Sequence, residues 1–177
     1  MIAYGYTFTG QNYRRTSKGK YINVLMVHLM EEMSFLERFP YFFKLESGDE
    51  AWYESMGFND DEWGLDDFTP EMEAAAKDYA MKVIQDAEDY PEIVDDSSCL
   101  FKEGASWYLR NMPVLESLPK EKRENAVVVA QIRIIKNFCE DVIVDENWTI
   151  YDGYALVNSH TGDFYAGVDW AQNSSKD

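Results

Sequence analysis

The stretch 148-WTIYDGYALVNSHTGDFYAGVDW-170 decides the fold class of this 177-residue chain. Strand-forming Thr, Ile, Tyr, Val and Phe residues dominate it, and the segment from Ser159 to Gly162 has the composition of a turn. This composition, with a turn in its middle, predicts an antiparallel meander near the C-terminus. Residues 2 to 9 (IAYGYTFT) have the same strand-forming character, so we predict that they form an N-terminal strand of the same small sheet.

Three to four helices are predicted to pack against this sheet, giving a single α+β domain over residues 1–177. Apolar residues recur at helical spacing over residues 21 to 38, and Pro40 ends that run. A second helix begins at Thr69 and Pro70, extends to Glu88 and ends before Pro91. Further helices are predicted over residues 99 to 111 and 119 to 142, a short strand over residues 41 to 45, and a disordered tail over residues 172–177.

The charge of the chain is strongly negative and unevenly placed. The net charge is −17, while 46% of the residues are hydrophobic and 15% are aromatic, which is typical of a packed domain and not of an acidic disordered tail. Residues 45–100 contain eighteen acidic residues and two lysines, so the net charge of this segment is −16. Residues 1 to 30 contain no acid but carry Arg14, Arg15, Lys18 and Lys20. The resulting directional field favours a basic protein partner and disfavours nucleic acid or an anionic membrane.

Motifs for metal or cofactor chemistry are not found. Cys99 and Cys139 lie far apart without a zinc-type spacing. With Gly64 at the sixth position of a calcium-binding loop, Trp63 and Pro70 fall where oxygen ligands belong. His28 is most simply a packing residue of the first helix, and His160 a polar turn residue. We therefore predict a protein without a bound cofactor or metal and without enzymatic activity.

The N-terminus also lacks the features of a secretory signal. MIAYGYTFTGQNYRR has neither a charged n-region nor an apolar h-region, and no apolar run approaches the ~18 residues of a membrane-spanning helix. The expected location is the cytoplasm, or the host cytoplasm if the protein is phage-encoded.

The leading hypothesis is that the acidic segment imitates the phosphate backbone of DNA. Duplex DNA carries one negative charge per ~1.7 Å of its axis, and carboxylates fixed on a helix would present a comparable array. Phage and mobile-element inhibitors of restriction or CRISPR enzymes share the small size, the acidity and the lack of catalytic motifs, although no motif aligns with them. The predicted partner-binding residues are Asp49, Glu50, Glu54, Asp60, Asp61, Glu62, Trp63, Asp66, Asp67, Glu71, Asp78, Asp86 and Asp89.

Three alternatives stand beside this hypothesis. The acidic surface is explained equally simply as a solvated face that keeps an assembly or adaptor protein soluble. The carboxylates of Asp60, Asp61, Asp66 and Asp67 would also suit Mg²⁺ or Ca²⁺ in a metal-dependent enzyme. In the third alternative, the acidic segment binds the basic N-terminal residues, either within one chain or across a homodimer.

Overall fold

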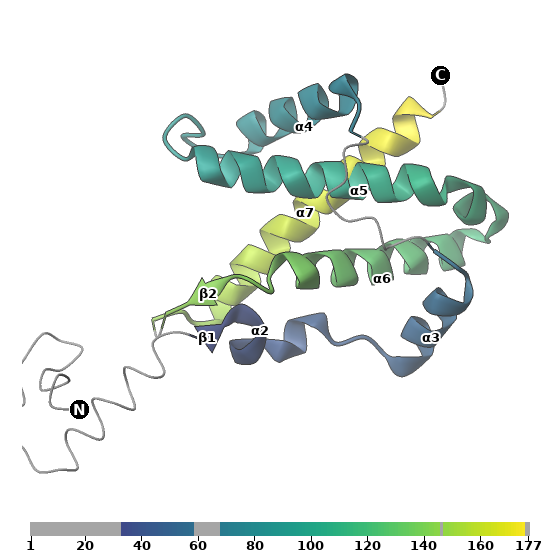
Figure 1. Cartoon of the computed structure of the whole chain (residues 1–177), viewed down its shortest axis with the longest axis horizontal. Helices are drawn as coiled ribbons and strands as arrows, with labels where there is room; N and C mark the ends of the chain where they lie inside the picture. Colours follow the sequence, from purple (N-terminus) through teal and green to yellow (C-terminus); the bar gives the residue numbers. More distant parts are fainter. Residues whose placement is uncertain (1–32, 59–67, 146, 176–177) are drawn as a thin grey trace, which may run out of the picture.

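The protein is mostly helical, with six α-helices and one two-stranded antiparallel sheet in the part of the chain that is described (Figure 1). This computed structural model describes residues 33–58, 68–145 and 147–175. In chain order the elements are β1 (Met33–Ser34), α2 (Phe35–Arg38), the 3-10 helix η2 (Pro40–Phe43), α3 (Ser47–Ser55), α4 (Pro70–Val83), α5 (Pro91–Ser117), α6 (Lys120–Phe138), β2 (Ile143–Val144) and α7 (Ile150–Ser174).

Helix α5 is the centre of this arrangement. It packs against α4 on one side and crosses α7, while α6 packs against α5, α7 and α3 (Figure 1). Apolar side chains from all these helices form one continuous core, in which Trp107 and Phe164 are fully buried at the α5–α7 interface. As a result, α4 and α3 lie at opposite edges of the molecule, with α5 and α6 between them (Figure 1).

The predicted C-terminal meander is wrong, because residues 150 to 174 form the single helix α7. The helix begins with a capping box, in which the Thr149 hydroxyl accepts from the Asp152 amide and the Asp152 carboxylate accepts from the Thr149 amide. Its buried positions follow helical spacing along one face: Gly153, His160, Asp163, Phe164, Gly167, Val168 and Ala171. Packing of this face against α5 outweighs the strand-forming composition that the meander prediction used.

Other predicted boundaries also differ from the structure. Met33 and Ser34, predicted as helical, pair with Val144 and Ile143 in the sheet. A short strand was predicted over residues 41 to 45. Instead, residues 40–43 form the 3-10 helix η2. Helix α7 continues to Ser174, so the predicted disordered tail is helical over residues 172–174. The predicted N-terminal strand and residues 21–32 of the first predicted helix lie outside the described residues.

The remaining helix predictions are confirmed in kind. Helix α4 begins at Pro70, with the Thr69 hydroxyl accepting from the Met72 amide, but it ends at Val83 and not at Glu88 as predicted, because the chain turns at Asp86 with a positive φ. Helix α6 occupies most of the range predicted from residue 119. Helix α5 is much longer than the predicted segment 99–111, since it begins at Pro91 and continues through Pro113. Burial of Leu115 beyond that proline shows why the helix continues: core packing offsets the cost of about 3 kcal/mol that an interior proline carries.

A candidate protein-binding surface at the α4–α5 corner

The connection between α4 and α5 is a tightly built turn. Helix α4 ends at Val83, and Asp86 adopts a left-handed backbone conformation with a φ of 55°. The amide of Asp89 donates to the Asp86 carbonyl at 2.8 Å. Pro91 then occupies the first position of α5, where its missing N–H is not needed. We call residues 84–96 the acidic corner.

A small hydrophobic cluster holds the acidic corner in place. Ala80 of α4, Ala87 of the connection and Val94 of α5 are buried together, and Ile84 packs against them. This cluster is separate from the main core. It fixes the corner to both helices, so that the charged side chains of the corner project from ordered backbone.

The acidic corner contains no basic residue of its own, and Lys82 on the last turn of α4 pairs with Asp78. Between Val83 and Phe101 the chain has six acidic residues and no Lys, Arg or His. All six are exposed: Asp86, Glu88, Asp89, Glu92, Asp95 and Asp96. Partial burial and the negative charges of Asp95 and Glu92 raise the pKa of the Asp96 carboxyl above its ordinary value. A nearby cation would relieve this repulsion.

Large apolar side chains are exposed beside these carboxylates. Met81, Val83, Tyr90 and Ile93 are 42%, 52%, 48% and 47% exposed. They lie on the last turn of α4, in the connection and on the first turn of α5, among the acidic residues of the corner. Exposed apolar side chains that are rimmed by polar or charged residues are typical of a protein interaction site.

The acids of α3 belong to a different part of the molecule. Asp49 accepts a hydrogen bond from the Asn125 side chain at 3.2 Å, and Glu54 lies 3.5 Å from the Arg133 guanidinium. The Lys122 ammonium lies 4.7 Å from the centre of the Trp52 ring. Side chains of α6 therefore contact Asp49 and Glu54 of α3, and Asp49, Glu50 and Glu54 are not brought together with the corner (Figure 1).

The other predicted binding residues divide into two groups. On α4, Glu71 and Asp78 are exposed, but Asp78 pairs with Lys82 at 2.5 Å and Lys77 lies one residue before it. The second group lies outside the described residues: Asp60, Asp61, Glu62, Trp63, Asp66 and Asp67. Of the thirteen predicted residues, the structure thus places Asp86 and Asp89 in the acidic corner.

Four acids of the acidic corner were absent from the predicted site: Glu88, Glu92, Asp95 and Asp96. Pro91 is the first residue of α5, whereas the sequence analysis predicts that it marks the end of the preceding helix. The signal was present in the sequence, because a run of six acids from residue 84 to residue 100 contains no basic residue.

Several titratable groups are buried in the core. Asp163 of α7, whose pKa is raised by burial, accepts a hydrogen bond from the Tyr79 hydroxyl of α4 at 3.1 Å. His160 is a buried residue of α7 and not the turn residue that we predicted; burial lowers its pKa to about 4, and its ring lies 5.1 Å from that of Phe138. Burial raises the pKa of the Cys139 thiol to about 12. Within the described ranges, no three His, Cys, Asp or Glu side chains are grouped so as to hold a metal ion.

No protein-family model, curated protein or solved structure matches the chain. In the part of the chain that the structure describes, none of the helices has the length and apolar character needed to cross a membrane.

Proposed function

We propose that this protein is a non-enzymatic inhibitor that binds a basic, nucleic-acid-handling protein through the acidic corner and excludes DNA by imitating its phosphates. The observation that carries the proposal is the group of six exposed carboxylates on the ordered α4–α5 connection and the first turns of α5, in a stretch of sequence that contains no basic residue. An ordered array loses less conformational entropy on binding than an acidic tail would lose.

The exposed apolar residues support a specific interface over a merely solvated one. A surface that only maintained solubility would have no need of Met81, Val83, Tyr90 and Ile93 at the same corner. Carboxylates steer a basic partner and accelerate its association, while buried aromatic and aliphatic anchors supply much of the binding energy. The proposed partner therefore has a basic groove with apolar positions beside it.

The first experiment captures binding proteins from the native host at low and moderate salt and then tests whether duplex DNA competes for them. A captured protein that releases this chain when DNA is added would support the proposal. Binding should weaken steeply as the salt concentration rises.

A charge-matched pair of variants assigns the interaction to the acidic corner. The triple variant Asp89→Lys, Glu92→Lys and Asp95→Lys should lower affinity at least 100-fold. The control carries the same change at Glu116, Glu121 and Glu140, which are exposed elsewhere. Equal losses in both variants would mean that net charge alone governs binding. No loss in either would refute the proposal.

The metal-dependent enzyme stays a separate prediction, because its proposed ligands lie in residues 59–67, outside the described ranges. Calorimetric titration with Mg²⁺, Mn²⁺ and Ca²⁺ tests it, since a carboxylate site for these ions gives saturable heat at millimolar metal.

A further inference from the structure

The first two turns of α7 expose large side chains on an ordered helix. The capping box of Thr149 and Asp152 fixes the start of the helix, so the residues that follow project from defined positions. Ile150, Tyr151 and Tyr154 are 53%, 81% and 60% exposed, and the value for Tyr151 is the highest among the large apolar side chains of the described residues. They lie where β2 leads into α7, away from the α4–α5 connection (Figure 1).

These three side chains share one face of α7. At 3.6 residues per turn they lie within an arc of about 100° around the helix axis, and the exposed Asn158 falls inside the same arc. We call Ile150, Tyr151, Tyr154 and Asn158 the tyrosine face. Asp152 lies outside it, about 100° from Tyr151 and about 160° from Tyr154.

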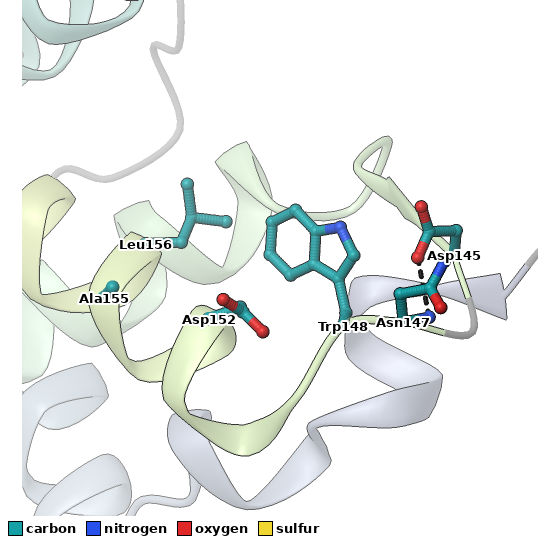
Figure 2. A pocket seen from close by; sticks show the side chains of 6 residues that line it. All are labelled: Asp145, Asn147, Trp148, Asp152, Ala155 and Leu156. Atoms are coloured by element: carbon teal, nitrogen blue, oxygen red, sulfur yellow. Dashed lines mark hydrogen bonds between the residues drawn. The ribbon is translucent and has the colours of Figure 1, made fainter.

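The tyrosine face contains no charged residue, although the net charge of the chain is −17. Between Asp152 and Asp169, the only Asp, Glu, Lys or Arg in the sequence of α7 is Asp163, which is buried. Asp152 belongs to another side of the helix, where it lines a pocket of about 530 Å³ together with Trp148 and Leu156 (Figure 2). A neutral face is where two copies of a strongly acidic protein meet with the least electrostatic repulsion.

The polar groups of the tyrosine face are able to pair with copies of themselves. A tyrosine hydroxyl and an asparagine side-chain amide each donate and accept hydrogen bonds. A two-fold axis brings the same patch of both copies together, so an interface of this kind has to satisfy its own polar groups. Carboxylates only accept, and the acidic corner therefore lacks this property.

The exposed area is sufficient for a weak dimer. Tyr151 and Tyr154 together offer roughly 280 Å² per copy, taking about 200 Å² for a whole tyrosine side chain. This is about a third of the ~800 Å² that each partner of a standard interface buries. Ile150, Asn158 and their neighbours add to it, so the contact is at the small end of specific interfaces and a micromolar dissociation constant is expected.

We propose that two copies of this chain associate across a two-fold axis through the tyrosine face, with Tyr151 and Tyr154 at the centre of the contact. The arrangement leaves the acidic corner accessible and does not depend on the proposed function.

Sedimentation velocity of the full-length chain over a range of protein concentrations tests the association. The expected result is a monomer–dimer equilibrium that shifts toward the dimer when the salt concentration rises from about 50 mM to about 500 mM, because screening reduces the repulsion between the two copies. A dimer in which the basic N-terminal residues contact the acidic segment would instead weaken over the same range. A chain that stays monomeric at hundreds of micromolar protein would overturn the proposal.

A charge-matched pair of variants assigns the contact to the tyrosine face. Asn158→Asp adds a carboxylate to the face, whereas Ser159→Asp adds the same charge at an exposed position about 100° further around α7. Asn158→Asp should raise the dissociation constant of the dimer about ten-fold, because it sets like charges against each other across the axis. Ser159→Asp should leave the constant nearly unchanged.

The double variant Tyr151→Ala and Tyr154→Ala should be monomeric at concentrations where the wild type is dimeric. Both side chains are exposed, so its circular dichroism spectrum should match that of the wild type. A dimer that weakens with salt, that responds equally to the two aspartate variants, or that persists in the tyrosine double variant would overturn the proposal.

Discussion

Two glycines permit the close crossing of α5 and α7, and replacing either with alanine should separate the helices. A Cβ added at Gly167 of α7 would overlap the Phe101 carbonyl oxygen and lie 2.9 Å from the Ala105 amide nitrogen. A Cβ added at Gly104 of α5 would overlap the Phe164 carbonyl oxygen in the same way. The obstacles are backbone atoms of a packed helix, so no side-chain rotation relieves the overlap.

The expected cost of Gly167→Ala follows from one stabilising and two destabilising contributions to the free energy of unfolding. Alanine favours a helix over glycine by about 1 kcal/mol. Restoring an ordinary carbon–oxygen contact requires the helices to move apart by on the order of 1 Å, which costs roughly 3 kcal/mol in overpacking strain. The movement also weakens the contacts of Leu100, Phe164 and Val168, which are buried at the crossing, by about 1 kcal/mol in all. We expect a net destabilisation of about 3 kcal/mol.

Gly162→Ala is the matched control, because Gly162 lies on the same helix with no atom within 4 Å of an added Cβ. It should stabilise the protein by about 1 kcal/mol. For a chain of this size, Tm should fall by about 6–12 °C for Gly167→Ala and rise by about 2–4 °C for the control. Calorimetry or thermal circular dichroism measures both.

The double variant Gly104→Ala and Gly167→Ala adds a test of geometry. Both substitutions separate the same pair of helices, so their combined destabilisation should be smaller than the sum of the single effects. A Gly167→Ala protein as stable as the wild type would refute the proposed close approach of the two backbones.

Three further predictions concern His160, Asp86 and Thr149. Burial lowers the pKa of His160 from 6.5 to about 4, so the stability that comes from its neutral form is complete above pH 6.5 and is lost as the pH falls through 4. Relative to His160→Leu, the wild type should lose about 3 kcal/mol over that window in urea titrations; parallel pH profiles would contradict this. Asp86→Gly should raise the free energy of unfolding by about 1 kcal/mol, because glycine adopts the left-handed backbone conformation of Asp86 (φ of 55°) without strain. The same substitution removes one carboxylate of the acidic corner and should weaken partner binding. A fall in Tm would contradict the turn geometry. Thr149→Ala should destabilise the protein by about 1 kcal/mol through loss of the α7 cap. NMR titration should show the pKa of Asp152 rising in that variant, because hydrogen bonds from Thr149 are the main cause that lowers it.

The sequence was sufficient for helices whose local signals agree with their burial. In α4, the Thr69 cap, Pro70 at the first position and the apolar spacing of Met72 and Ala76 all indicate a helix that begins where the structure has it. The predicted helix 119–142 has apolar residues at helical spacing that include Val128, Ile135 and Cys139. Ile135 of α6 and Cys139 at its C-terminal cap are buried, whereas Val128 is exposed. Neighbouring residues decide both helix starts, so a single sequence contains the information.

Local composition failed where packing between distant segments decides the structure. The residues of α7 have strand-forming character, and only contact with α5 explains why glycine occurs at position 167 within a helix. The predicted helix 99–111 ends two residues before Pro113, yet burial of Leu115 keeps α5 continuous beyond that proline. Propensities differ by about 1 kcal/mol per residue or less for most residue types, so a buried helix face outweighs them.

The candidate binding surface shows the same division. The sequence by itself determined the amount of negative charge, its concentration in residues 45–100 and the absence of basic residues between Val83 and Phe101. The tertiary structure decided which of these charges share a surface, since it places α3 beside the basic side chains of α6 and exposes the corner between α4 and α5. Charge is a property of each residue, whereas a binding surface depends on distances that the packing of the helices alone sets.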